Sequence, residues 1–207
     1  MLGGLAALAA PSVAWAAGSK RSFELLRGGN DIGFHTLTAT ETGGDLIVDI
    51  VIEIRVKVLG ITAYLYEHEN RETWRGGELI AIDAKTNADG NDEFCRVARS
   101  GEGYKIEGSA FSGDVAGQIA PTSYWNFNNF GVNRWVSTQS GKVLDVVFKN
   151  KTTADGGSDW NVTGPDNFET NLVYDASKEW RGCSFDARGT DITYTETAPG
   201  PRLLALL

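Results

Sequence analysis

The stretch DLIVDIVIEIRVKV, residues Asp45–Val58, decides the fold expected for this chain. Its even-numbered positions are all leucine, isoleucine or valine, whereas most of its odd-numbered positions are charged. Because successive side chains of a strand point to opposite faces, this alternation predicts one β-strand with an apolar and a polar face. At about 3.4 Å per residue the strand would run roughly 45 Å. A helix is excluded, since a period of two would scatter the branched side chains around its circumference. Ile47 and Val51 interrupt the polar face, and we expect part of that face to be covered too.

The composition favours a single all-β domain. The chain has 207 residues with 25 glycines and 5 prolines, and short runs of β-branched and aromatic residues alternate with glycine turns. No Pro/Ser-rich linker or run of charge divides it. The formal net charge of −8 comes from interspersed residues of both signs. The lack of a basic stripe argues against a nucleic-acid partner or an anionic-membrane partner.

Turn signals divide the chain into about twelve expected strands. No expected helix is long enough for a parallel crossover, so successive strands should pair antiparallel. We therefore predict a large antiparallel meander curled into an open or closed barrel, because so wide a sheet must curl. The expected strands are 22–27, 32–40, 45–58, 61–74, 78–86, 92–99, 104–107, 142–148, 160–163, 168–174, 179–186 and 190–195.

One segment without strand pattern, 109–140, is predicted to be an aromatic-rich loop with a short helical turn that starts near Pro121. Its residues 124–135 hold five large aromatic side chains, which would expose too much apolar surface on a solvated loop. We interpret them as a structural plug of the barrel, since aromatic residues mostly serve packing. The alternative is a lid over a ligand pocket at the barrel mouth. In that case the candidate ligand-binding residues are Tyr64, Tyr66, Trp74, Trp125 and Asn126.

Both histidines, His35 and His68, are further candidates, because the two could approach each other in the concavity. A histidine with a carboxylate from Glu67, Glu69 or Glu72 would make an acid/base unit. No nucleophile motif such as GxSxG accompanies them. A histidine hydrogen-bonded inside a β-face is the favoured interpretation, and we assign no catalytic residue.

No metal site or cofactor is expected. The stretch 87–93 superficially suggests a calcium loop, but strands flank it and Asp89-Gly90 is a strong hairpin signal. Cys95 and Cys183 form no CxxC or Cys/His cluster. The two are predicted either to form a disulfide or to be free core thiols, and their spacing does not decide between these.

The chain is predicted to be exported. Residues 1–16 carry no charge and end in Ala14-Trp15-Ala16, which is typical of the apolar core and cleavage site of a secretory signal. The basic region that opens a secretory signal is missing, and we therefore expect the true start of the chain to lie upstream. Pro11 and the short run argue against a membrane anchor, so we expect no membrane span after signal removal. The mature protein, periplasmic or secreted, would comprise a single β-domain (17–197) and an irregular tail (198–207).

Six short motifs have the order and spacing of a known family. They are Ile32-Gly33-x-His35, Val56-Lys57-Val58-Leu59-Gly60-Ile61, Trp74-x-x-Gly-Glu-Leu79, Thr86-Asn87-x-Asp89-Gly90, Pro121-Thr122-Ser123-x-Trp125-Asn126 and Thr138-Gln139-x-Gly141. Over residues 22–194 the chain resembles an uncharacterised family of exported bacterial proteins, domain of unknown function 6134. The resemblance implies fold and export, and no activity, substrate or catalytic residue comes with it.

Three functions follow as hypotheses. The first is an exported, non-catalytic β-barrel-like protein that binds an apolar or lipid-like ligand on its concave face. The second is an enzyme, hydrolase-like or otherwise, that uses His35 or His68 with a nearby carboxylate. The third is a structural or partner-docking envelope protein, which an exposed sheet edge or apolar patch would favour.

Overall fold

The computed structural model describes residues 19–187, 189–198, 200 and 202–207 and confirms the predicted all-β fold. The predicted signal at 1–16 lies outside these residues. Thirteen strands form one sheet, in which every neighbouring pair is antiparallel. They are β1 (Ser19–Arg27), β2 (Asn30–Thr42), β3 (Asp45–Val58), β4 (Ile61–Arg75), β5 (Glu78–Ala88), β6 (Asn91–Ser100), β7 (Gly103–Gly108), β8 (Ser112–Ala116), β12 (Val147–Thr152), β13 (Ser158–Thr163), β14 (Glu169–Tyr174), β15 (Trp180–Asp186) and β16 (Asp191–Ala198).

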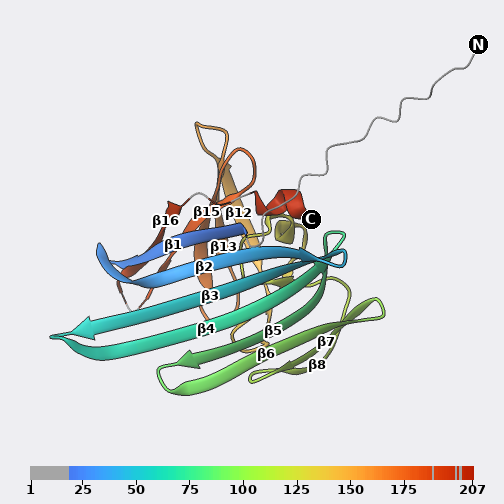
Figure 1. Ribbon diagram of the computed structural model, residues 1–207, viewed down its shortest axis with the longest axis horizontal. Coiled ribbons are helices and arrows are strands. Elements are labelled where there is room, and N and C mark those ends of the chain that lie inside the picture. The colour runs from blue at the N-terminus through green and yellow to red at the C-terminus, as the bar shows by residue number, and fades with distance from the viewer. Residues whose placement is uncertain (1–18, 188, 199, 201) are drawn as a thin grey trace, which may run out of the picture.

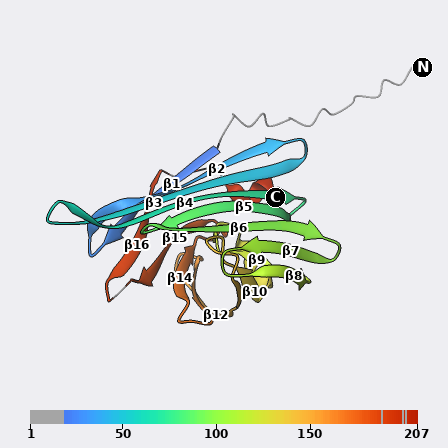
Figure 2. The ribbon, with the colours of Figure 1, turned by 90° about the horizontal axis from the view of Figure 1, so that it is seen from below.

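The sheet is an open curl. Its order is β12-β13-β14-β15-β16-β1-β2-β3-β4-β5-β6-β7-β8, so pairing of β16 with β1 joins the two ends of the described chain. The two edge strands, β8 and β12, form no ladder with each other in the part of the chain that is described. Strands β1–β8 form one arm and β12–β16 form the other (Figures 1 and 2). Of the two predicted alternatives, the open barrel is therefore the one found.

A small second sheet lies between the two arms (Figure 2). It consists of β9 (Ala120–Pro121), β10 (Arg134–Val136) and β11 (Val143–Asp145), with β9 parallel to β10. We call residues 117–146, which hold this sheet and the aromatic segment, the insert. The predicted loop 109–140 is therefore wrong in part, because it also contains the five-residue edge strand β8 of the large sheet. The strands of the small sheet have only two or three residues, too few to show a period. The predicted strand 142–148 is two strands, since the chain changes sheets at the buried Val146.

The predicted helical turn is present, but it does not start near Pro121. The 3₁₀ helix η1 spans Phe127–Gly131, and the Asn126 side chain caps it by accepting from the Asn128 backbone N–H at 3.0 Å. Pro121 instead pairs with Val136 in the small sheet. A second 3₁₀ helix, η2 (Leu203–Leu206), lies in the tail predicted as irregular, and its Leu203 side chain is buried. No helix in the ranges described is long and apolar enough to cross a membrane.

The hairpins of β1–β6 all turn through two residues with positive φ, the signature of type I′ turns. Three of these turns are Gly-Gly, and the fourth, Asp89-Gly90, confirms the hairpin interpretation of the candidate calcium loop. The remaining turn, Leu59-Gly60 between β3 and β4, places a leucine where glycine, asparagine or aspartate is usual.

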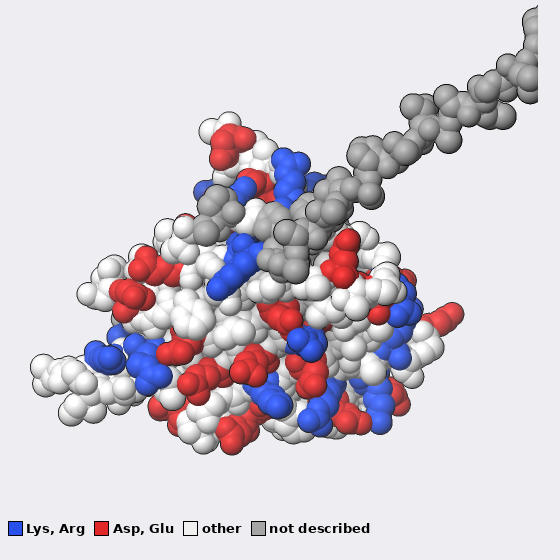
Figure 3. Space-filling view, viewed as in Figure 1, with Lys and Arg blue, Asp and Glu red and all other residues white. Residues whose placement is uncertain are grey.

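Strand β3 has the predicted length and the predicted two faces. Its even-numbered residues Leu46, Val48 and Ile50 are buried in the core. The odd face is the outer surface, where charged residues of both signs intersperse (Figure 3), and cross-strand pairs such as Arg71–Asp49 at 2.7 Å form there. Of the two apolar residues on this face, Val51 is 39% exposed and so has no cover, whereas Ile47 is half-buried.

Candidate functional site

The concave face holds a cavity of about 720 Å³. The even face of β3 is divided between the insert and this cavity. The residues of its first half, as far as Ile50, are buried in the core. Ile52, Ile54 and Val56 line the cavity and are only half-buried. One uninterrupted apolar face thus supplies both the core and a wall of the cavity, because the insert fills only one end of the curl.

Most of the cavity wall is apolar. The side chains come from β3 and β4, from the opposite arm and from the insert, so the curl of the sheet brings them together. Apart from four tyrosines, the apolar lining consists of Ile32, Ile52, Ile54, Val56, Val58, Ala63, Leu144, Pro165, Phe168, Phe185, Ala187 and Ile192.

A neutral polar cluster closes one end of the cavity. The His68 Nδ1 lies 2.8 Å from the Thr86 hydroxyl, and its Nε2 lies 3.4 Å from the Thr138 hydroxyl. The Tyr66 hydroxyl donates to Gln139 Oε1 at 3.3 Å, and the Gln139 amide donates to Glu93 at 3.1 Å. Burial lowers the pKa of His68 to about 4, so its imidazole is uncharged at neutral pH. The members of the cluster that line the cavity, Tyr66, His68, Thr138 and Gln139, offer hydrogen bonds without a net charge, because Glu93 lies outside the lining.

The two histidines do not form a pair. In the sheet register His35 lies opposite Ile52 of β3, and Ile52 lies opposite His68 of β4. The backbones of the two histidines are therefore two strand spacings, about 10 Å, apart. His35 does not line the cavity; it packs among Phe23, Trp180 and Tyr194, with ring centroids 5.2–6.0 Å away.

His35 is buried without a polar partner. Neither ring nitrogen has a hydrogen bond within the described chain. Burial, with a smaller contribution from His68, lowers the pKa of His35 to about 3. No hydrogen bond between a carboxylate and either imidazole occurs among the described residues. The favoured interpretation of a histidine hydrogen-bonded inside a β-face therefore describes His68 and not His35.

Trp74, Trp125 and Asn126 belong to the packing of the insert. Both indole N–H groups donate to the same oxygen of the buried Glu72 carboxylate, at 3.0 Å from Trp74 and 2.9 Å from Trp125. Asn70 donates to its other oxygen at 3.0 Å. Burial raises the pKa of Glu72, while these donors favour the ionised form. None of the three predicted residues lines the cavity, so this part of the insert is a plug and not a lid.

Of the seven candidate ligand-binding residues, the cavity brings together Tyr64, Tyr66 and His68. The insert adds Tyr124, Thr138 and Gln139, which the sequence reasoning missed as site residues. Thr138 lies seventy positions from His68, its hydrogen-bond partner. No local pattern signals such a contact; only the curl of the sheet creates it.

The two cysteines are free and buried in the structure. Cys95 lies on β6 and Cys183 on β15, and six strands separate β6 from β15 in the sheet order. The described residues contain no group of three or more histidine, cysteine or acidic side chains that could hold a metal ion.

The chain matches the model of the family described as "Domain of unknown function (DUF6134)" over residues 23–197. It is also similar to a solved structure, a β-barrel-like protein of the domain of unknown function DUF1849 from Brucella abortus, with a TM-score of 0.59. The sequence identity is 9%, and the similarity covers 87% of this chain and 96% of that one. This likeness supports the fold alone. No curated protein matches the chain.

Proposed function

The chain belongs to the family described as Domain of unknown function (DUF6134), and from this premise and its cavity we propose that it is an exported, non-catalytic binding protein for an apolar or lipid-like small molecule. The single observation that carries the proposal is the cavity of about 720 Å³ on the concave face, lined largely by aliphatic and aromatic side chains. Ligand sites in proteins typically have volumes of about 300–1,000 Å³ and are predominantly apolar with a few placed polar groups.

The distribution of polar groups supports an amphipathic ligand. The β3 side chains that line the cavity are all aliphatic and form no hydrogen bonds, so this wall suits the hydrocarbon part of a ligand. They are Ile52, Ile54, Val56 and Val58. The neutral cluster of His68, Thr138 and Gln139 suits an uncharged hydrogen-bonding group. Charged side chains of the lining, Arg27 among them, suit a polar or anionic head instead. A ligand with one polar end and an aliphatic body satisfies both surfaces.

The geometry favours binding over catalysis. His68 is the imidazole that lines the cavity, and both its ring nitrogens already contact threonine hydroxyls. An acid/base unit requires a partner that shuttles or orients the proton within about 3 Å. Of the carboxylates expected for that role, Glu67 and Glu69 are exposed in the outward-facing positions of β4. The third, Glu72, is buried and accepts hydrogen bonds from Asn70, Trp74 and Trp125.

A tryptophan placed in the cavity tests the proposal. Ile54→Trp should fill the space beside β3 and lower the affinity for dansyl-labelled undecanoic acid, measured by fluorescence titration, by about tenfold or more. The matched control is Val51→Trp, which puts the same side chain on the outer face of the same strand, where Val51 is 39% exposed. The control should bind as the wild type does.

Native mass spectrometry provides a second readout. The wild-type protein should carry the additional mass of a co-purifying ligand, and the Ile54→Trp variant should lack it. Two results would overturn the proposal. One is a wild-type protein with neither a co-purifying mass nor saturable probe binding. The other is equal probe affinity for the wild type and the Ile54→Trp variant.

A further inference from the structure

The β3–β4 hairpin projects beyond the rest of the sheet. The ladder between β2 and β3 ends at the pair Gly33–Ile54, and the ladder between β4 and β5 ends at Tyr66–Ala88. Beyond these ends, the backbone ladder of residues 55–65 runs only between β3 and β4, apart from the Leu65 carbonyl, which accepts from the Asp89 N–H at 2.7 Å. We call this two-stranded extension the projecting ribbon. It extends past its neighbours on the left in both views (Figures 1 and 2). Isolated two-stranded hairpins are marginally stable in water, so such an extension needs a reason.

The tip of the projecting ribbon is apolar and fully in solvent. Leu59 is 99% exposed, Ile61 is 74% exposed and Val58 is 56% exposed. Leu59 also has a positive φ of 51°, which leucine adopts less readily than glycine or asparagine. The other four turns of β1–β6 meet the same backbone demand with Gly-Gly or Asp-Gly. Leu59 is thus unfavourable in both exposure and conformation, and such departures from local rules concentrate at functional sites.

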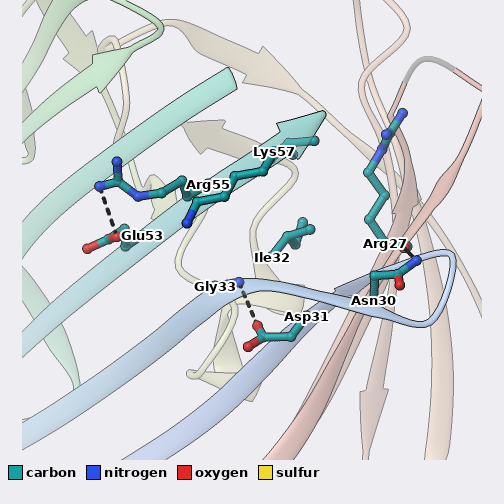
Figure 4. Close-up of a pocket in the computed structure, with 9 residues that line it drawn as sticks. Arg27, Asn30, Asp31, Ile32, Gly33, Glu53, Arg55 and Lys57 are labelled. Carbon is teal, nitrogen blue, oxygen red and sulfur yellow. Dashed lines mark hydrogen bonds and ion pairs between the residues drawn. The ribbon is translucent and has the colours of Figure 1, made fainter. Parts of the chain in front are cut away.

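Basic side chains surround the base of the ribbon. From Ile54 to Tyr66 the chain carries Arg55 and Lys57 and no acidic residue, within a protein of net charge −8. A notch of about 590 Å³ lies where β2 and β3 separate, with Arg27 on one side and Arg55 and Lys57 on the other (Figure 4). Glu53, which pairs with Arg55 at 3.3 Å, and Asp31 also line the notch, so its three basic side chains exceed its two acidic ones by one. In Figure 3, blue side chains lie between the white tip at the left edge and the main body of the protein.

The apolar tip is continuous with the cavity. Val58 lies in the tip and also lines the cavity, followed along the concave face of the ribbon by Val56 and Ile54. Tyr64 lies opposite Val56 on the same face and lines the cavity as well. An apolar track therefore leads from the exposed end of the ribbon into the proposed binding site.

We propose that the tip of the projecting ribbon docks on a lipid bilayer that contains anionic headgroups. Aliphatic side chains enter the interface while flanking Lys and Arg attract anionic lipids, which is the usual division of labour for proteins bound to a membrane surface. A protein partner fits less well, because a stable protein interface buries about 800 Å² on each side and a two-residue turn offers far less. The whole-chain charge argued against an anionic surface, but residues 54–66 carry Arg55 and Lys57 and no acidic residue.

Flotation with lipid vesicles tests this inference independently of ligand binding in the cavity. The wild-type protein should float with vesicles of phosphatidylcholine mixed with phosphatidylglycerol, and less with phosphatidylcholine alone. Leu59→Asn removes the apolar tip but puts the preferred residue at the positive-φ position, so the fold is retained. We expect it to lower the partition coefficient by about tenfold or more. Its dansyl-undecanoic acid affinity without vesicles should be unchanged, which separates this inference from the proposed function.

A charge reversal tests the basic flank. Lys57→Glu should weaken flotation with the anionic vesicles, whereas the matched control Lys149→Glu, at an exposed position of β12, should not. The inference is overturned if the wild-type protein does not float, or if Leu59→Asn floats equally well. It is also overturned in favour of a protein partner if the wild type self-associates without vesicles, Leu59→Asn abolishes that association, and neither floats.

Discussion

Replacing His35 with phenylalanine should make the protein less sensitive to acid. His35 is 3% exposed, its ring nitrogens have no hydrogen bond in the described structure, and burial lowers its pKa from 6.5 to about 3. Below pH 6.5 the unfolded chain therefore binds a proton that the folded chain excludes. Since the pKa is depressed on folding, His35 lowers the stability as the pH falls from its unfolded pKa toward its folded pKa.

The size of this effect follows from proton linkage. With pKa values of 6.5 unfolded and about 3 folded, a single histidine lowers the free energy of unfolding by about 2 kcal/mol between about pH 7 and pH 5. His35→Phe removes this contribution and keeps an aromatic ring against Phe23, Trp180 and Tyr194. The loss of stability over this interval should thus be about 2 kcal/mol smaller in the variant than in the wild type.

Urea unfolding followed by tryptophan fluorescence at about pH 7, 6 and 5 measures this difference. Burial raises the pKa of Glu72 and of Glu179, so these two carboxyl groups act in the opposite direction to His35. They lower the free energy of unfolding as the pH rises above about 4.5. Both carboxyl groups are present in the wild type and the variant, so their contribution cancels in the comparison. An unchanged pH dependence in His35→Phe would refute the reasoning, because it would mean that this imidazole is hydrated or protonated in the folded protein.

Three further experiments, two substitutions and one labelling reaction, have defined outcomes. Glu72→Leu leaves two buried indole N–H groups without an acceptor and should cost about 3 kcal/mol in urea unfolding, with Glu72→Gln retaining part of that stability. Gly33→Ala would place a Cβ atom onto a carbonyl oxygen of β3 and should lower the melting temperature well below that of Gly29→Ala, where the added Cβ meets nothing within 4 Å. Cys95 and Cys183 should react with Ellman's reagent only after denaturation, because both thiols are buried and burial raises the pKa of each, that of Cys95 to about 12.

The candidate site was predictable in part. Tyr64, Tyr66 and His68 alternate along one strand, so their common face could be read from period two, and the cavity contains all three. Trp74 has the same parity, yet it lies beneath the insert, at the end of the curl where the indole of Trp125 shares its carboxylate partner. Parity therefore identified the face and not the position along it, which depends on where the insert packs.

The sequence by itself determined the strands of the large sheet other than β8, most of their turns and the two faces of β3, because alternation and positive-φ residues act over a few positions. It also marked Leu59-Gly60 as a turn, without indicating that the turn projects. The tertiary structure alone decided that β2 and β5 leave the β3–β4 ribbon unaccompanied, and that the cavity begins at Ile52. The physical reason is that register and curl join residues far apart in the chain. What covers the apolar face of β3, core at one end and cavity at the other, is set by those contacts and not by the strand's own pattern.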